Sequence, residues 1–375
     1  MKITAAVLQR SGAPRPYAQS RPLEICEVNL DGPGTGEVLI RLHAAGLCHS
    51  DLSVIDGTRP RPLPMALGHE ATGEIIEVGQ GVTRFKPGDH VVLIFMPACG
   101  HCQPCATGRP ALCEPGAEAN GAGTLLGGAR RLNQQGAALN HHLGVSAFAT
   151  HAVVSENSCI AIDKSLPFAT AALFGCAVLT GVGAVVNTAA AVPGSTMAVI
   201  GLGGVGLSAI LGARLSGARQ IIALDTDDTK LARATALGAT HAIKAGTATT
   251  LDELRDISHG GVDYAFEMAG SVPALELAYA ATARGGTTVT AGLPPPDRQL
   301  SLQALSLVAA ERTLKGSYMG SSVPTRDVPR YIALHQRGLL AVEALLTHRL
   351  PLAAVNEGFD RLADGACVRQ VIDLA

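Results

Sequence analysis

The stretch Met197-Ala198-Val199-Ile200-Gly201-Leu202-Gly203-Gly204-Val205-Gly206 decides the fold of the central part of this chain. Its apolar start reads as a buried strand that runs into a G-x-G-x-x-G pattern, and Leu207–Ser216 then reads as a helix. The glycines permit a tight turn, a close approach of phosphates to the backbone, and close packing of helix on strand. Because N–H groups at the start of the helix face those phosphates, the stretch predicts a dinucleotide-binding loop.

An acidic residue further along supports this interpretation. Asp225 stands nineteen residues after Gly206, at the end of the next apolar strand, Ile221–Leu224. A carboxylate there can accept hydrogen bonds from both hydroxyls of an adenosine ribose. Its charge would repel a 2′-phosphate, and no arginine follows immediately to receive one, so the pattern favours NAD. The alternative is a solvated acid at a strand end.

The regions on either side of the loop differ in pattern. After the loop, strands and helices alternate as in a doubly wound parallel α/β sheet. Its later strands are expected at 264–267, 287–290 and 314–318. Before Cys176, short alternating segments indicate an irregular β-barrel. Strands are expected at 38–43 and 73–79, and 87–93 is expected to be a turn that enters another strand. Residues 117–142 are rich in Gly, Ala, Asn and Gln and are expected to form a long surface loop.

Length and composition limit the class of protein. The chain has 375 residues, 47% hydrophobic and 16% charged, which is more than one hydrophobic core holds, so two domains are expected. A formal net charge of −2 without a Lys/Arg run argues against binding of nucleic acid or anionic lipid. The start, Met1-Lys2-Ile3-Thr4, has no secretory signal pattern, so a cytoplasmic location is expected.

One uncharged stretch, between Lys164 and Arg214, is long enough to cross a bilayer. Proline and glycine interrupt it repeatedly, and buried elements of a parallel α/β core produce equally apolar runs. We therefore expect a core segment and no membrane partner, with a membrane span as the alternative.

Four of the nine cysteines cluster at Cys99, Cys102, Cys105 and Cys113. Disulfides are not expected in a reducing cytosol. The C-x2-C-x2-C-x7-C spacing, with Gly and Pro between ligands, is typical of a closed tetrahedral Zn²⁺ site that stabilises the fold and leaves no position for a substrate. The alternatives are an iron–sulfur cluster, whose common spacings differ, and unrelated buried thiols.

A second group of potential ligands, Cys48, His69 and Cys176, is dispersed along the chain. Each is weak evidence alone, because single buried Cys and His residues usually serve packing. Two sulfurs and one imidazole nevertheless suit a catalytic zinc, whose fourth position stays open for water or an alcohol oxygen. The accompanying four-cysteine site and dinucleotide loop favour this interpretation, with two zinc ions per chain.

Polar residues beside these ligands have expected catalytic roles. Asp51 and Glu70 are expected to accept the ring N–H of His69 and fix its tautomer, the alternative being two surface acids. Ser50 is expected to hydrogen-bond the substrate alcohol and to pass its proton outward. His49 is a less favoured helper in that proton transfer.

With these elements in this order, the sequence resembles the zinc-dependent medium-chain alcohol dehydrogenases over almost its whole length. The resemblance rests on Gly68-His69-Glu70, the four-cysteine lobe, Cys176, the Gly201–Gly206 loop with Asp225, and Arg312-Thr313-Leu314-Lys315-Gly316-Ser317. It implies a GroES-like catalytic domain formed from both ends of the chain around a Rossmann domain. The implied bounds are 1–177, with a structural zinc lobe at about 97–114, then 178–319 for NAD binding, and 320–375.

The resemblance also implies roles outside these motifs. Thr180 would pack against the nicotinamide, Lys230 would approach the adenosine ribose beside Asp225, and His49 and Arg369 would approach the pyrophosphate. The long 117–142 segment resembles that of the dimeric branch, so a homodimer joined through the strand near 316–319 is expected, with a tetramer as the alternative.

Some positions bear on the substrate. Many relatives carry a His five residues after the first cysteine ligand to complete a proton relay, and this chain has Ser53 there. The resemblance implies a substrate channel lined by Arg59, His142 and Leu143. Arg59 is unusual in that place, and we hypothesise that it favours a polar or anionic substrate tail; the alternative is a solvated Arg at the rim.

The predicted function is reversible hydride transfer between a primary or secondary alcohol and NAD⁺, giving an aldehyde or ketone. One rival is a formaldehyde dehydrogenase that acts on an S-hydroxymethyl thiol adduct such as that of glutathione. A rival of another class is an NAD-binding redox sensor or scaffold without turnover.

Overall fold

The computed structural model describes residues 1–374, which its internal contacts divide into two compact units. The first, here called the barrel unit, contains Met1–Cys176, Val323–Pro329 and the residues from Leu346 onward. The second, the nucleotide unit, contains Ala177–Ser322 and Arg330–Leu345. Residues 330–345 therefore cluster with the nucleotide unit, although the sequence analysis places them in the C-terminal part of the catalytic domain.

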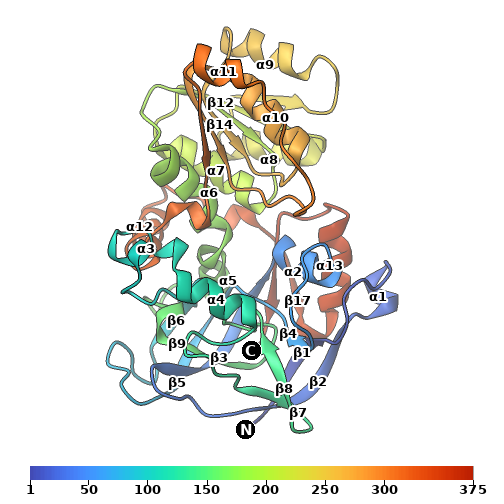
Figure 1. Cartoon of the computed structure of the whole chain (residues 1–375), viewed down its shortest axis with the longest axis vertical. Helices are drawn as coiled ribbons and strands as arrows, with labels where there is room; N and C mark the ends of the chain where they lie inside the picture. Colours follow the sequence, from blue (N-terminus) through green and yellow to red (C-terminus); the bar gives the residue numbers. More distant parts are fainter. Residues whose placement is uncertain (375) are drawn as a thin grey trace. The chain divides into compact units, whose positions relative to one another are not determined.

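The nucleotide unit is built on one six-stranded parallel sheet (Figure 1). Its strands, from edge to edge, are β13 (His241–Lys244), β12 (Gln220–Asp225), β11 (Thr196–Ile200), β14 (Val262–Glu267), β15 (Thr282–Thr290) and β16 (Thr313–Gly316). The chain runs outward from β11 to β13 and then returns to continue from β14 to β16. This reversal is the switch point beside which Rossmann sheets bind dinucleotides.

Helices flank the sheet in the alternation that the sequence predicts. They are α6 (Ala177–Gly183), α7 (Gly204–Leu215), α8 (Asp228–Leu237), α9 (Thr250–Ser258), α10 (Val272–Ala281) and α11 (Ala304–Ala309). All five residues of β11 are buried, which explains its continuous apolar pattern. The strand β13 was not predicted, because only Ile243 of its four residues is buried and no apolar run marks it.

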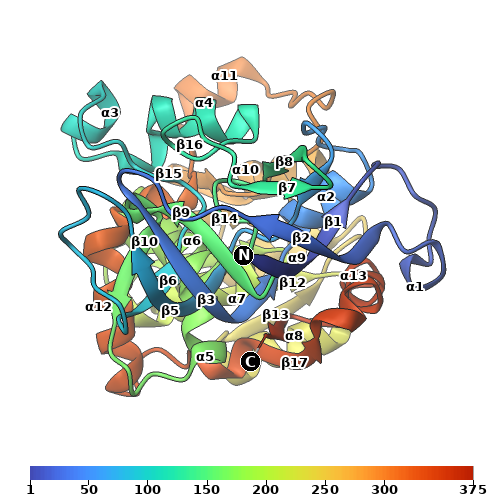
Figure 2. The same cartoon turned by 90° about the horizontal axis from the view of Figure 1, so that it is seen from below.

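Five strands of the barrel unit form a closed barrel, and most of them are labelled in Figure 2. They are, in order around it, β1 (Lys2–Leu8), β2 (Leu23–Leu30), β7 (Leu132–Gln134), β8 (Ala137–His141) and β4 (Met65–Ala66), and β4 pairs back with β1. The barrel therefore has no open edge at this end.

The expectation of a long surface loop at 117–142 is wrong. Its first residues belong to helix α4 (Glu114–Ala122), and its last residues form the hairpin of β7 and β8. In this hairpin β7 pairs with β2 and β8 pairs with β4, which closes the barrel. Its Gly, Ala and Asn content has low intrinsic strand propensity, but pairing with neighbouring strands overrides that preference.

A larger sheet completes the barrel unit. Its strands are β10 (Cys159–Ile162), β6 (His90–Leu93), β5 (Ala71–Val78), β3 (Glu37–Leu47), β18 (Arg369–Asp373) and β17 (Leu346–Pro351), with β9 (His151–Ser155) also paired to β3. The remaining α-helices are α1 (Tyr17–Ser20), α2 (His49–Ile55), α3 (Gln103–Ala106), α5 (Phe168–Ala172), α12 (Pro324–Gln336) and α13 (Val355–Ala363). The pairing of β18 with β3 brings the C-terminal part of the chain into the N-terminal sheet.

The uncharged stretch of the sequence does not form one long helix. Within residues 1–374 no single helix is both long and apolar enough to cross a membrane. Only the bent pair Phe168–Gly175 and Ala177–Ala189 meets that requirement of length and composition, and only when the two are taken together.

Candidate functional site

Three dispersed residues, Cys48, His69 and Cys176, converge in the barrel unit. One ligand atom from each lies within 4.8 Å of the other two. Cys48 immediately precedes α2, His69 follows β4, and Cys176 follows a short 3-10 turn, Leu173–Gly175. The structure thus brings together the three residues that the sequence analysis groups as ligands of a catalytic zinc.

The residue before His69 has to be glycine. Gly68 has φ of +92°, and a Cβ there would lie 2.5 Å from the backbone nitrogen of Phe148. Any side chain would push this segment away from its neighbour, so Gly68 lets His69 enter the buried cluster.

The donor set of this cluster favours a cation. A hydrogen bond between Cys48 and Cys176, together with the contact of Cys48 with His69, holds the pKa of the Cys48 thiol well below its usual range. The same Cys48–Cys176 hydrogen bond raises the pKa of the Cys176 thiol. Two thiol groups and an imidazole at these distances match the ligands of an open tetrahedral zinc site, with a fourth position left for another ligand.

Asp51 sits at the centre of the polar contacts around these residues. Its Oδ1 lies 3.0 Å from His69 Nδ1 and accepts the Gly68 N–H at 3.2 Å, while Oδ2 accepts the Cys48 N–H at 3.2 Å. Burial alone would raise the pKa of Asp51, but the two neighbouring imidazoles, His69 and His142, hold it well below its usual value. An ionised Asp51 fixes the His69 proton on Nδ1 and leaves Nε2 free for a metal.

The same contacts act on His69. Burial would lower the pKa of its imidazole, but Asp51 and Cys48 raise it to about 10. Without a metal the neighbouring acidic groups thus stabilise a second proton on this ring, and a metal ion bound at Nε2 would take the place of that proton.

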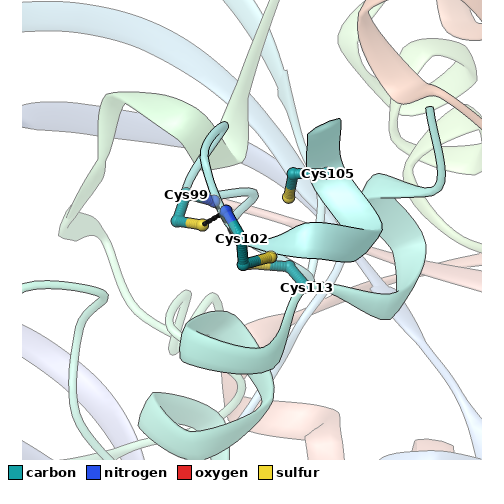
Figure 3. A group of neighbouring side chains, drawn as sticks. All are labelled: Cys99, Cys102, Cys105 and Cys113. Atoms are coloured by element: carbon teal, nitrogen blue, oxygen red, sulfur yellow. Dashed lines mark hydrogen bonds between the residues drawn. The ribbon is translucent and has the colours of Figure 1, made fainter. Parts of the chain in front are cut away.

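The four clustered cysteines form a compact knot (Figure 3). Their sulfur atoms all lie within 4.8 Å of one another. The Cys99 N–H and the Gly116 N–H donate to Cys113 Sγ at 3.2 and 3.4 Å, and the Cys102 N–H donates to Cys99 Sγ at 3.3 Å. Backbone donors aimed at sulfur stabilise thiolates, so the knot fits the closed zinc site that its spacing predicts.

The dinucleotide loop has the geometry of a phosphate cradle. Gly203 caps α7, and no atom lies within 4 Å of the place where its Cβ would be. A Cβ at Gly206 would instead collide with the carbonyl oxygen of Gly201, so helix and strand can meet only with glycine there. Open space above the helix start, beside unhindered backbone, fits a pyrophosphate group.

Asp225 is held rigidly at the end of β12. Its Oδ2 accepts the Leu202 N–H at 2.7 Å and its Oδ1 accepts the Asp227 N–H at 3.0 Å. The carboxylate thus lies beside the glycine loop, as expected for an acid that binds a ribose. Lys230 is half-buried on α8 and Thr180 is buried on α6.

Comparison with known proteins gives the family. The description "Alcohol dehydrogenase GroES-like domain" matches residues 34–164, and "Zinc-binding dehydrogenase" matches residues 204–337. A candidate alcohol dehydrogenase of Mycobacterium tuberculosis, alcohol dehydrogenase D, is 41% identical over 377 residues, covering 99% of this chain and 100% of its own length. This chain belongs to the zinc-binding alcohol dehydrogenase family.

Solved structures of alcohol dehydrogenases share the fold of this dehydrogenase. An alcohol dehydrogenase zinc-binding domain protein from Burkholderia ambifaria has a TM-score of 0.94 and 36% identity, over 100% of this chain and 99% of that one. A benzyl alcohol dehydrogenase from Acinetobacter calcoaceticus has a TM-score of 0.93 and 32% identity, over 100% of both chains. The protein is therefore an oxidoreductase with a GroES-like part and a Rossmann part.

The expectation that Glu70 accepts the ring N–H of His69 is wrong. Glu70 makes no hydrogen bond to His69 within the described residues; instead its buried carboxylate forms an ion pair with Arg369, the first residue of β18. A guanidinium is the stronger partner for a buried carboxylate, since it neutralises the charge. Arg369 is only 4% exposed, and its expected approach to a pyrophosphate stays a prediction.

The residues of the expected proton path lie on the first turns of α2. Ser50 is half-buried and His49 is exposed. Ser53, which stands where many relatives have a relay His, donates its hydroxyl to the His49 carbonyl oxygen at 2.8 Å. Its hydroxyl proton is thus engaged within the helix, and the relay role of Ser50 stays a prediction.

The residues expected to line a substrate channel differ in their surroundings. Arg59 is half-buried and Leu143 is 7% exposed with φ of +50°. His142 is 1% exposed, and its Nδ1 lies 3.1 Å from Asp51 Oδ1. Sequence reasoning missed this contact, because nothing local to either residue signals it.

Proposed function

We propose that this protein is a zinc-dependent, NAD-linked alcohol dehydrogenase that interconverts a primary or secondary alcohol and its aldehyde or ketone. The observation that carries the proposal is the convergence of Cys48, His69 and Cys176, three ligands with one coordination position to spare, in a chain that also has a phosphate-cradling loop. A closed four-cysteine knot alone would stabilise a fold but would catalyse nothing.

The residues around the three-ligand centre would divide the chemistry among them. Zinc bound there would supply a Lewis acid that makes a substrate hydroxyl more acidic. Asp51 keeps the His69 proton on Nδ1, so that Nε2 can serve as a ligand. Ser50 Oγ would accept the hydroxyl proton and pass it to water. The hydrogen on the alcohol carbon would leave as hydride to NAD⁺, so that one carbonyl, one NADH and one proton are formed.

The choice of NAD and the count of two zinc ions are part of the proposal. The Asp225 carboxylate, held by two backbone N–H groups, would accept ribose hydroxyls and repel the 2′-phosphate of NADP. The knot of Cys99, Cys102, Cys105 and Cys113 would hold the second, structural ion.

Substrate class follows from two further features. The similarity to a benzyl alcohol dehydrogenase supports aromatic primary alcohols as the first to be tested. The positive charge of half-buried Arg59 supports a polar or anionic tail on the substrate. An Arg59→Leu variant that handles acidic and neutral alcohols in the same ratio as the parent would refute the role of Arg59.

Self-association is proposed through β16. This strand is an edge of the nucleotide sheet, and the preceding helix α11 exposes Leu305 and Val308 at 69% and 75%. A second copy would pair with the edge and cover these side chains. Light scattering on the purified protein should give twice the chain mass, and a monomer at micromolar concentration would contradict the proposal.

The test of the function is an NAD-reduction screen with zinc measured on the same sample. Primary, secondary and aromatic alcohols should be oxidised by a protein carrying two zinc ions per chain. Activity on formaldehyde only with added glutathione would identify a thiol-adduct dehydrogenase instead. Full zinc and NAD binding without turnover of any alcohol or aldehyde would indicate a sensor or scaffold. Normal activity of His69→Ala or Cys176→Ala would refute the ligand assignment.

A further inference from the structure

A second imidazole reaches the carboxylate that orients His69. His142 Nδ1 lies 3.1 Å from Asp51 Oδ1, the same oxygen that lies 3.0 Å from His69 Nδ1. The two imidazole rings meet edge to face, with centroids 5.5 Å apart. Both rings are 1% exposed and Asp51 is 0% exposed, so water does not compete for this oxygen. One carboxylate oxygen therefore lies within about 3 Å of a nitrogen of each of two imidazoles.

The group that His142 Nδ1 contacts is the Asp51 carboxylate. Within residues 1–374, its buried Nδ1 meets full hydrogen-bond geometry with no group, and Asp51 Oδ1 is the carboxylate oxygen that lies within reach of it, at 3.1 Å. An ionised carboxylate only accepts, so a proton on Nδ1 is the tautomer of His142 that this contact favours. The main chain at His142 is held in place, because its backbone N–H donates to Ser146 Oγ at 2.9 Å.

Asp51 does not depend on His142 for its position. The Cys48 N–H and the Gly68 N–H donate to its two oxygens, one to each. Asp51 also lies in the first turn of α2, in a capping arrangement with Cys48. Loss of the His142 ring would therefore change the charge that Asp51 presents more than it would change where Asp51 lies.

We propose that His142 is a positioning residue that draws Asp51 charge away from His69 and so weakens zinc binding by His69 Nε2. The inference rests on the proposed function of the Cys48, His69 and Cys176 centre. A carboxylate that accepts the N–H of a ligating imidazole makes its other nitrogen more basic. Sharing Oδ1 with His142 leaves a smaller part of that effect for His69. The zinc is then held less tightly and remains a stronger Lewis acid.

Two substitutions separate this role from a merely structural one. His142→Leu removes the donor and keeps an apolar group of useful size, whereas His142→Asn keeps an amide N–H near the place of Nδ1. The holoenzyme would be loaded with Co²⁺ at the open centre, and release of the ion to a chelator would be followed by its visible absorption. His142→Leu should release the ion more slowly, by up to about 10-fold, the low end of the effect of an outer partner. His142→Asn should match the parent in release rate and spectrum.

A structural role would have the opposite sign. If His142 only filled space, both variants would loosen the centre and release the ion faster, and that result would overturn the proposal. The matched control is His141→Gln, a neighbouring buried imidazole that accepts the Arg131 N–H; its release rate should equal that of the parent.

A second measurement covers variants that fail to fold. Nitrogen-15 NMR of the histidine-labelled parent should show the His142 proton on Nδ1, and a proton on Nε2 would overturn the proposal. The zinc content of the parent distinguishes the two levels of inference. A parent whose open centre takes up neither zinc nor Co²⁺ would end the proposed function as well, whereas a filled centre with unchanged release in His142→Leu would end only the role of His142.

Discussion

Asp51 Oδ1 lies 3.0 Å from His69 Nδ1 in a pocket where both side chains are almost fully buried. This contact decides which nitrogen of His69 can meet a metal. It also places a full negative charge within one ring's width of the proposed zinc, where little water screens it. The first prediction concerns this charge.

Asp51→Asn should keep a hydrogen-bond acceptor for His69 and remove the charge. We expect the open centre to bind zinc about 10- to 100-fold more weakly, as is usual when an outer partner of a ligand is lost. Metal competition with a chelator measures this affinity. Asp56→Asn, at the exposed C-terminal end of the same helix, is the control and should bind zinc like the parent. Equal affinity in Asp51→Asn would show that Asp51 serves the fold alone.

Cys105→Ser should empty the four-cysteine knot and leave the open centre filled. Zinc should fall from two ions to one per chain, because a structural site needs all four ligands. Metal binding there contributes folding free energy, so the thermal midpoint should fall by on the order of 5 °C. Cys26→Ser, a half-buried thiol outside both clusters, is the control. Two retained zinc ions in Cys105→Ser would contradict the assignment.

Asp225→Asn should impair NAD binding without affecting either metal. The Asn carbonyl oxygen can still accept the Leu202 N–H and hold the glycine loop, whereas the Asp227 N–H loses its acceptor. Loss of a charged acceptor for ribose hydroxyls should raise KM for NAD about 10- to 100-fold, from roughly 1.5–3 kcal/mol per charged hydrogen bond. The preference for NAD over NADP should fall as well. Asp228→Asn, an exposed acid paired with Lys244 on the neighbouring strand, should leave both values unchanged.

Local patterns made parts of this protein predictable from sequence. The strand, the glycine loop and the helix from Met197 onward are adjacent in the chain, and the structure confirms β11, α7 and β12 near their expected bounds. The cysteine knot is equally local. Cys48, His69 and Cys176 are far apart in the chain. They could be predicted to share one metal site only because the four-cysteine site, the dinucleotide loop and a family resemblance supported that grouping.

Three features could not be predicted from the sequence because they depend on contacts between segments that are far apart in the chain. The β7 and β8 hairpin has a loop-like composition, and only its pairing with β2 and β4 makes it part of a barrel. Glu70 stands beside a ligand in sequence, but a strand from the far end of the chain supplies Arg369 as its partner. The contact of His142 with Asp51 likewise depends on how two remote segments pack.

A buried histidine should make stability fall in mild acid. His141 is 1% exposed, its Nε2 accepts the Arg131 N–H at 3.0 Å, and burial together with Arg130 and Arg131 lowers its pKa to about 3. In the unfolded chain the same imidazole has a pKa near 6.5. Between these values the unfolded chain binds a proton that the folded chain does not, so stability is full above pH 6.5 and falls as the pH decreases.

Between pH 6.5 and 5.5 the free energy of unfolding should fall by about 1 kcal/mol from His141 alone. His141→Gln keeps an acceptor for the Arg131 N–H but cannot be protonated, so this part of the pH dependence should vanish. Urea unfolding of parent and variant at both pH values measures the difference, and groups common to both proteins, including the zinc ligands, cancel. Parallel curves for the two proteins would mean that His141 takes up its proton without unfolding, and that the ring is less firmly enclosed than its burial indicates.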